Sequence, residues 1–355
     1  MSTNDIFTKT LNIWYLNNKR DLPWRKTKDP YIIWLSEIIL QQTKVSQGTT
    51  YFLKFRNKYP NVNSLAKASE EEILKLWQGL GYYSRARNLH RTAIHIAKNY
   101  KGVFPDNYLD LFKLYGVGDY TASAIASICF NEPTATVDGN VFRVLSRKFG
   151  IYTPIDSTVG FKEFKNLAQI LLDKNSPGDH NQALMEFGAL ICTPKNPKCN
   201  DCPFSENCYG KKFLAIEKLP QKSKKIKIRK RFFNYLVFRN QSNLTLIQQR
   251  NGNDIWKNLY EFPLIESKAE IDFKYLVDDE TFQLLLLHKG YHITKYNAKP
   301  ILHKLTHQHL YCTFWIIDTN LDKSKATDWG NLNKFAVPTL IQNFIDNYKK
   351  SDYFL

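Results

Sequence analysis

Four of the six cysteines of this chain stand close together, with the spacing C-x6-C-x2-C-x5-C. They are Cys192, Cys199, Cys202 and Cys208. Four soft thiolates in one short segment can close on a single metal centre. Zinc ribbons generally use two C-x2-C pairs, and only one such pair is present here, so the spacing favours a four-iron cluster over zinc.

A second short segment could hold an anion. The sequence LYGVGDYTA at 114–122 stands between two stretches with helical periodicity, 109–114 and 120–129. Gly116 and Gly118, on either side of Val117, allow a tight turn and a close approach of the backbone to phosphate, with amides available at the start of the second helix. Taken alone, this pattern is better explained by a plain turn between helices. The neighbouring motifs reverse that preference.

Together these features resemble the MutY-type adenine-DNA glycosylases of the helix-hairpin-helix superfamily that includes endonuclease III. Two further segments match closely, SEIILQQT at 36–43 and VDGNVFRVL at 137–145. The resemblance spans most of the chain, most closely 20–208 and more loosely 232–345. The hairpin differs from the family pattern at Tyr115, where the family has proline.

The resemblance implies a base-excision repair enzyme. It would bind double-stranded DNA as a monomer, flip out adenine paired with 8-oxoguanine or guanine, and hydrolyse its N-glycosidic bond. It would carry one 4Fe-4S cluster on a basic cysteine loop and work in the bacterial cytoplasm at the nucleoid. Four lysines flank the cysteines: Lys195, Lys198, Lys211 and Lys212.

Cleavage of an N-glycosidic bond needs a proton for the departing base and a negative charge near the cationic sugar. By resemblance, Glu37 protonates adenine and later activates water, and Asp138 stabilises the oxocarbenium ion. Tyr120 and Asn140 would orient these groups. Glu37 needs a raised pKa for this role, whereas Asp138 should remain ionised. The structural alternatives are a first-turn glutamate for Glu37 and a helix N-cap for Asp138.

The family members that also cut the backbone have a lysine after the hairpin glycines, which forms a Schiff base. Tyr120 stands there, so we predict a glycosylase without strong lyase activity. Two alternatives stay open: a pyrimidine-lesion glycosylase with lyase activity, and a DNA-binding scaffold that has lost catalysis.

The same resemblance assigns substrate contacts. The adenine pocket would include the RDLPWR segment and one acidic residue, namely Arg20, Leu22, Trp24, Arg25 and Glu186. Core packing is the alternative for Leu22 and Trp24. The residues expected to enter the duplex or support the partner base are Gln42, Thr43 and Tyr82.

The second half of the chain resembles a Nudix-like domain, from the QQR segment at 248–250 to IWKNLYEFP at 255–263. No Glu-rich helix for magnesium follows, so we expect recognition rather than nucleotide hydrolysis. The segment HKLTH at 303–307 is similar to the Phe-Ser-His loop that senses 8-oxoguanine. Here Leu305 replaces Phe and Thr306 replaces Ser, while His307 is retained.

The elements that must position these residues fall into two domains. Helical periodicity and caps at Asp29-Pro30 and at Ser69 with Glu72 predict a mainly α domain over 1–213, with the cluster loop at 192–208. A basic linker is expected at 214–231, where a solvated tether and a path along DNA phosphates are equally good explanations. Alternating strands then predict an α/β domain over 232–348, before a tail at 349–355.

The overall charge suits a polyanionic partner. Lys and Arg number 50 against 33 Asp and Glu, for a net charge of +17. A proteome rich in lysine would give the same bias, so charge alone does not decide the partner. No apolar run is long enough to span a bilayer, and the remaining cysteines, Cys129 and Cys312, do not suggest a secreted disulfide framework.

Overall fold

The computed structural model describes residues 3–223, 227–286 and 290–350. The chain divides into two compact units, one formed by residues 1–68 and 87–224 and the other by residues 69–86 and 225–355. Residues 224–226 of the predicted linker and 351–355 of the predicted tail lie outside the described residues. In the described parts, no helix combines the length and apolar content that a bilayer span requires.

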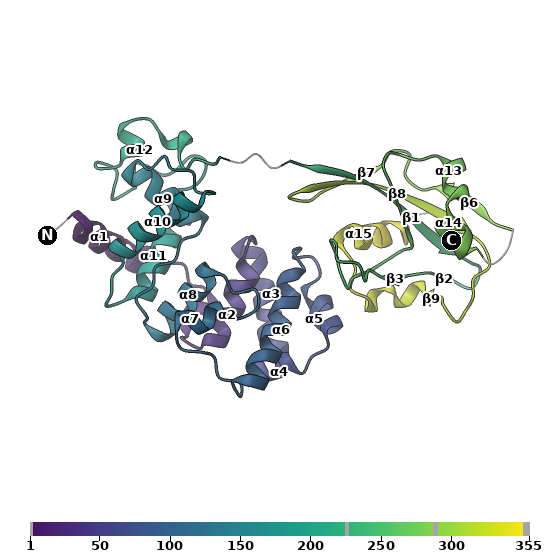
Figure 1. Cartoon of the computed structure of the whole chain (residues 1–355), viewed down its shortest axis with the longest axis horizontal. Coiled ribbons are helices and arrows are strands. Elements are labelled where there is room, and N and C mark those ends of the chain that lie inside the picture. The colour runs from purple at the N-terminus through teal and green to yellow at the C-terminus, as the bar shows by residue number, and fades with distance from the viewer. Residues whose placement is uncertain (1–2, 224–226, 287–289, 351–355) are drawn as a thin grey trace. The chain divides into compact units, whose positions relative to one another are not determined.

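The first unit is helical, as Figure 1 shows in purple to teal. Every regular element described between residues 3 and 218 is a helix. They are α1 (Thr3–Asn18), η1 (Pro23–Lys26), α2 (Pro30–Leu40), α3 (Val45–Lys58), α4 (Val62–Ala66), α5 (Glu70–Trp77), α6 (Ser84–Asn99), α7 (Tyr108–Phe112), α8 (Asp119–Phe130), α9 (Gly139–Phe149), α10 (Thr158–Leu171), α11 (Pro177–Leu190), α12 (Tyr209–Lys212) and η2 (Ile216–Lys218). Of these, α5 and the start of α6 belong to the second unit.

Local capping explains where the important helices begin. Asp29 accepts a hydrogen bond from the amide of Tyr31 (2.9 Å) and is followed by Pro30 at the first helical position of α2. Ser69 and Glu72 form the predicted capping box of α5. A core of large side chains then packs α1, α9, α10 and α11 together, including Leu11, Val144, Phe164 and Phe187.

The second unit contains a mixed five-stranded sheet with the order β5-β1-β8-β6, and β7 also pairs with β8. Its central strands are parallel, with Arg229 opposite Gln308. The strands of this unit are β1 (Arg229–Arg239), β2 (Leu244–Thr245), β3 (Gln248–Gln249), β4 (Tyr260–Glu261), β5 (Leu264–Ser267), β6 (His292–Lys295), β7 (Ile301–Lys304), β8 (Gln308–Asp318) and β9 (Thr327–Asp328). Strand β1 thus begins inside the segment 214–231 that we expected to be linker.

Alternation along the strands buries both faces of this sheet. Phe233 and Tyr235 of β1 face a core shared with α15 (Thr339–Tyr348) and η3 (Trp329–Lys334). Leu236 and Phe238 face the opposite core, which contains residues of α13 (Phe273–Asp278) and α14 (Glu280–Leu285). The sheet is therefore covered by helices on both sides (Figure 1), as expected for the predicted α/β domain.

Candidate active site

Glu37 is a partly buried carboxyl in the last turn of α2, between the buried residues Ser36 and Ile38. The alternative of a first-turn glutamate that complements the helix dipole is therefore wrong. Burial raises the pKa of Glu37 to about 7; the charge of Asp138 also raises it, against the opposing effects of a hydrogen bond from Tyr120 and the charge of Arg25. Near neutral pH, a large fraction of Glu37 is thus protonated and able to donate.

Tyr120 hydrogen-bonds to Glu37 and also lies near enough to Asp138 to be affected by its charge. It stands in the first turn of α8, and burial together with the charges of Glu37 and Asp138 raises its pKa well above 10. Its hydroxyl oxygen also lies 3.1 Å from Sδ of Met185. A neutral phenol next to both carboxyl groups means that Glu37 and Asp138 line the same site.

Asp138 is the N-cap of α9, so the capping alternative is confirmed for this residue. Its Oδ1 accepts hydrogen bonds from the amides of Asn140 (2.9 Å) and Val141 (2.8 Å), and Oδ2 accepts from Nδ2 of Asn140 (2.7 Å). Burial raises the pKa of Asp138, and these hydrogen bonds and the charge of Arg143 oppose that rise. The cap fixes the carboxylate in place at the site, which is compatible with a catalytic role.

Arg143 is a residue that sequence reasoning missed. It is buried, and its guanidinium donates to Oδ1 of Asn140 (2.8 Å), to the carbonyl of Gly188 (2.7 Å) and to the carbonyl of Cys192 (2.6 Å). Arg143 therefore ties the Asp138 cap to the end of α11 and to the first cysteine. The signal available in the sequence was the arginine three positions after Asn140, a spacing that places both side chains on one face of a helix.

Arg20, Arg25 and Glu186, which were expected to line one pocket, lie in contact with one another. The Glu186 carboxylate is buried and accepts hydrogen bonds from Nε of Arg20 (2.8 Å) and from both terminal nitrogens of Arg25 (3.0 and 2.9 Å). Burial alone would raise the pKa of Glu186, but the two guanidinium groups lower it to about 2. The cluster is an ionised carboxylate held between two cations.

Leu22 and Trp24 flank this cluster in sequence and are both buried. The Trp24 ring packs edge-on against Phe52, with centroids 5.3 Å apart. This geometry is what the core-packing alternative expects for Trp24.

Gln42 and Thr43 follow the end of α2. Gln42 is exposed and has φ +53, an unusual backbone conformation for a residue other than glycine. Thr43 is partly buried, and its hydroxyl donates to the carbonyl of Gln41 (3.2 Å). The Gln41 side chain donates to Oγ1 of Thr121 (3.2 Å), which ties this turn to α8.

The helix-hairpin-helix prediction is confirmed in its local geometry. Helices α7 and α8 flank a turn in which Gly116 has φ +73 and Gly118 is the N-cap of α8. Gly118 is exposed, and a Cβ added there would meet nothing within 4 Å, so this side of the turn is open to solvent. Val117 is buried and anchors the turn.

Tyr115, which stands where the family has proline, is held by neighbours from α6. The guanidinium of Arg91 lies 3.7 Å from the centre of the Tyr115 ring, and Oγ1 of Thr92 donates to the Tyr115 carbonyl (2.8 Å). These two contacts hold the ring and the backbone of Tyr115 at the start of the turn.

The four cysteines line one small cavity, together with Arg147 and Ile191. Within the described residues, no group of three or more His, Cys, Asp or Glu side chains is arranged to hold a single metal ion.

Arg147 holds the cysteine loop together. It donates to the carbonyls of Thr193 (2.7 Å) and Pro194 (3.0 Å), and it lies 3.6 Å from Sγ of Cys192. The four lysines that flank the cysteines, Lys195, Lys198, Lys211 and Lys212, are exposed. The loop therefore presents its positive charges to solvent.

Tyr82, Thr306, Leu305 and His307 all belong to the second unit. The hydroxyls of Tyr82 and Thr306 lie 2.5 Å apart. Leu305 is partly buried against the sheet core, whereas Thr306 and His307 are exposed in the turn between β7 and β8. The structure thus brings two of the predicted recognition residues into direct contact.

The two segments that indicated a Nudix-like domain also meet. Strand β3 pairs with β4, and Arg250 donates to Oε1 of the buried Glu261 (2.7 Å), whose other oxygen accepts from Tyr235 (3.2 Å). Buried polar groups are satisfied here by partners within the protein.

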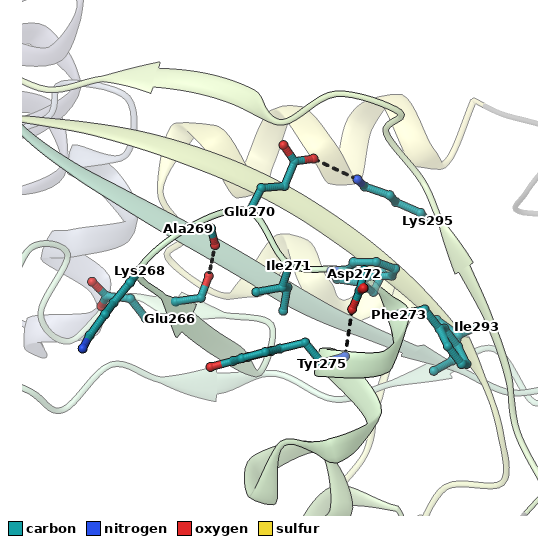
Figure 2. A pocket seen from close by; sticks show the side chains of 12 residues that line it. Glu266, Lys268, Ala269, Glu270, Ile271, Asp272, Phe273, Tyr275, Ile293 and Lys295 are labelled. Carbon is teal, nitrogen blue, oxygen red and sulfur yellow. Dashed lines mark hydrogen bonds and ion pairs between the residues drawn. The ribbon is translucent and has the colours of Figure 1, made fainter.

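A broad cavity lies beside α13 in this domain, and Figure 2 shows two of its acidic side chains, Glu270 and Asp272, with their hydrogen-bond partners. Glu270 accepts a hydrogen bond from Lys295 (3.1 Å), and Asp272 accepts from the amide of Tyr275 (2.9 Å) (Figure 2). Glu266 pairs with Arg231 through two hydrogen bonds (2.7 and 2.6 Å). Each of these three carboxylates therefore has a hydrogen-bond partner within the protein.

Known proteins share both parts of this architecture. Residues 35–174 match the HhH-GPD superfamily of base excision DNA repair proteins, and residues 234–347 match the NUDIX domain. An adenine DNA glycosylase of Buchnera aphidicola subsp. Schizaphis graminum is 34% identical over 357 residues, which cover 97% of this chain and 99% of that protein.

Two solved structures share the helical part. A thermostable thymine-DNA glycosylase is 33% identical with a TM-score of 0.55, over 59% of this chain and 97% of its own. An endonuclease III trapped as a covalent intermediate with DNA has a TM-score of 0.52 at 22% identity, over 60% of this chain and 100% of its own, and shows the fold alone. The predicted fold class is confirmed. By its full-length similarity, this chain belongs to the adenine DNA glycosylase family.

Proposed function

We propose that this chain hydrolyses the N-glycosidic bond of adenine paired with 8-oxoguanine or guanine in double-stranded DNA. The observation that carries the proposal is the pair of carboxyl groups around Tyr120, in which Glu37 has a pKa of about 7 and Asp138 is held by three hydrogen bonds. An N-glycosidase needs these two functions, a proton donor for the base and a negative charge for the sugar.

In the proposed reaction, Glu37 donates its proton to N7 of the flipped adenine, and the bond between N9 and the sugar breaks with its electron pair going to the base. Asp138 then stabilises the cationic sugar. Glu37, now ionised, takes a proton from the water that attacks the anomeric carbon, which regenerates the starting state. Asn140 keeps Asp138 oriented, and Tyr120 orients Glu37.

Adenine recognition is assigned to the cluster of Arg20, Arg25 and Glu186. A flipped purine presents donors and acceptors on its edge, and a buried ionised carboxylate beside guanidinium groups offers complementary partners. Because Glu186 is held by both arginines, its orientation is set before the base arrives.

The cysteine cavity fits a 4Fe-4S cluster held by Cys192, Cys199, Cys202 and Cys208. Burial raises the pKa of the Cys202 thiol to about 11, so a bound cation is needed to keep its thiolate form near neutral pH. When bound, such a cluster supplies covalent cross-links that fix the basic loop for DNA phosphates.

We assign no strong lyase activity to this chain, because Tyr120 stands where lyases place their amine. A phenol cannot form a Schiff base with the opened sugar. Borohydride should therefore trap little covalent complex; efficient trapping would favour the endonuclease III-like alternative.

The proposed partner of the second unit is the base opposite adenine. Thr306 and His307 are exposed hydrogen-bonding groups, and Tyr82 offers an aromatic ring beside them. We further propose that the protein acts as a monomer on the chromosome in the bacterial cytoplasm.

The central experiment measures adenine release under single-turnover conditions from duplexes with A opposite 8-oxoguanine and A opposite G. Wild type should release adenine from both, faster opposite 8-oxoguanine. His307→Ala should reduce the ratio of the two rates. No adenine release by cluster-loaded wild type would refute the proposed activity, and an unchanged ratio in the variant would refute the role of His307.

A further inference from the structure

The position of Tyr82 depends on a tight turn after α5. Gly79 has φ +101, Gly81 has φ +68, and Tyr82 itself has φ +46. A residue other than glycine in the left-handed region is held there by its surroundings rather than by its own preference. Nε1 of Trp77 donates to the Gly81 carbonyl (3.0 Å), which closes the turn. The backbone at Tyr82 therefore follows directly from a closed turn at the end of α5.

Arg85 contacts both Trp77 and Tyr82 and so supports the same turn. The guanidinium of Arg85 lies 5.1 Å from the centre of the Trp77 ring and 5.7 Å from that of Tyr82. Burial lowers the pKa of Arg85 to about 10, so it keeps its charge near neutral pH. Arg85 thus links the Tyr82 ring to Trp77 of α5.

Within the same unit, polar side chains of α5 and the following turn are docked on the Nudix-like domain. Nζ of Lys75 donates to the Phe335 carbonyl (2.7 Å) and to Oε1 of Gln78 (3.0 Å). Nε2 of Gln78 donates to the Gln342 side chain (2.7 Å), and Oε1 of Gln78 accepts from the amide of Val337 (3.4 Å). Lys75 and Gln78 are thus hydrogen-bonded to each other, and each is also hydrogen-bonded to the segment 335–342.

Two further contacts lie beside these hydrogen bonds. Nδ2 of Asn258 donates to the Glu70 carboxylate at the start of α5 (2.5 Å), and the Tyr83 hydroxyl donates to the Val337 carbonyl (3.5 Å). The docking therefore extends from the beginning of α5 to the residue after Tyr82.

We propose that Lys75 and Gln78 are positioning residues for 8-oxoguanine recognition, because they hold the Tyr82 turn where its hydroxyl meets Thr306. This inference rests on the proposed function. Neither side chain needs to touch DNA. Their effect is to set the separation of the Tyr82 and Thr306 hydroxyls, now 2.5 Å, and hydrogen bonds between hydroxyls are lost over a displacement of about 1 Å.

Chemistry favours Lys75 as the more sensitive of the two. Burial lowers the pKa of its ammonium, which is partly desolvated against the Phe335 carbonyl. A hydrogen bond from a charged group is stronger than a neutral one, and removing the donor leaves a carbonyl without its partner.

The test compares single-turnover adenine release opposite 8-oxoguanine and opposite G. Lys75→Met should lower the 8-oxoguanine rate more than the G rate, so that their ratio falls by about fivefold or more, since charged hydrogen bonds contribute on this scale. Lys75→Arg retains a charged donor and should keep most of the preference. Lys67→Met is the matched control, because it removes one exposed positive charge from the first unit.

A double-mutant cycle separates positioning from a general structural role. If Lys75 acts through Tyr82 and Thr306, Lys75→Met should cause little further loss of preference in a Thr306→Val background. Gln78→Ala should behave like Lys75→Met, and the unfolding temperature of each variant shows that it folds.

Three results would overturn the inference: equal loss on both substrates in Lys75→Met, an unchanged ratio, or additive losses in the double variant. Failure of the proposed function has a different signature, because wild type itself would then release no adenine or show no preference between the two duplexes.

Discussion

Arg143 donates a 2.8 Å hydrogen bond to Oδ1 of Asn140, and through Asn140 it orients the Asp138 carboxylate. The same guanidinium binds the Cys192 carbonyl, so the support of the carboxylate depends on the cysteine loop. A side chain with no direct role in the reaction thereby couples two functional segments.

Arg143→Gln should slow adenine release by about 10- to 100-fold, the usual range for partners that support a functional group from behind. It should also lower the free energy of unfolding by roughly 3 kcal/mol, because buried carbonyls lose their donor. Single-turnover kinetics and urea unfolding measure the two effects. Arg143→Lys should recover little, since one ammonium cannot reach all three acceptors.

Glu37→Gln should abolish adenine release while duplex binding persists. The amide keeps the size of the side chain and removes the transferable proton, so the loss should reach about 1000-fold or more, at the upper part of general acid effects. Asp138→Asn should act likewise by removing the negative charge. Fluorescence anisotropy with the same duplex gives the binding control, and near-normal turnover in either variant would contradict its assigned role.

The rate of the chemical step should fall as pH rises above 7. Glu37 must carry a proton to act, and its pKa is raised to about 7. The measurement is the single-turnover rate constant from pH 5.5 to 9 on a cluster-loaded sample. A rate that increased continuously through this range would exclude Glu37 as the acid.

The same pKa makes a prediction about stability. A carboxyl group whose pKa is raised in the folded protein makes its full contribution to stability below its pKa in the unfolded state, near 4.5. That contribution to the free energy of unfolding is lost as the pH rises through the folded pKa of about 7. The unfolding free energy of Glu37→Gln, relative to wild type, should therefore increase between these pH values. The increase should be at most about 3 kcal/mol. A difference that stayed constant with pH would show that Glu37 is not perturbed.

Glu186→Gln should impair adenine recognition. The substitution leaves the guanidinium groups of Arg20 and Arg25 without their carboxylate, so a reduction of kcat/KM by about 10- to 100-fold is expected for loss of a buried charged partner. Asp21→Asn is a suitable control, because Asp21 is exposed in the same segment. Equal kinetics for Glu186→Gln and wild type would remove Glu186 from the pocket.

Cys202→Ala should reduce bound iron and sulfide and the visible absorbance of the purified protein. The substitution removes one of four thiols around the cavity. Cys129→Ser, outside the loop, should keep the full iron content. Iron retained at the wild-type level in Cys202→Ala would contradict the proposed ligand set.

Much of the architecture could be predicted from the sequence, because the signals are local. The Asp29 cap of α2, the Ser69 capping box, the two hairpin glycines and the alternation of β1 each depend on neighbouring residues. The cysteine spacing is also local, since all four thiols lie within one loop. Such patterns determine the helical domain, the sheet and the candidate metal site before any long-range contact is known.

Only the tertiary structure decided how these local pieces meet. The raised pKa of Glu37 arises from its burial in the folded protein. The hydrogen bond from Arg143 to the Cys192 carbonyl joins residues 49 positions apart, and the contact of Tyr82 with Thr306 joins residues 224 positions apart. The docking of Lys75 on the Phe335 carbonyl spans 260 positions. Desolvation and hydrogen bonding depend on which segments pack together, and no local pattern encodes that choice.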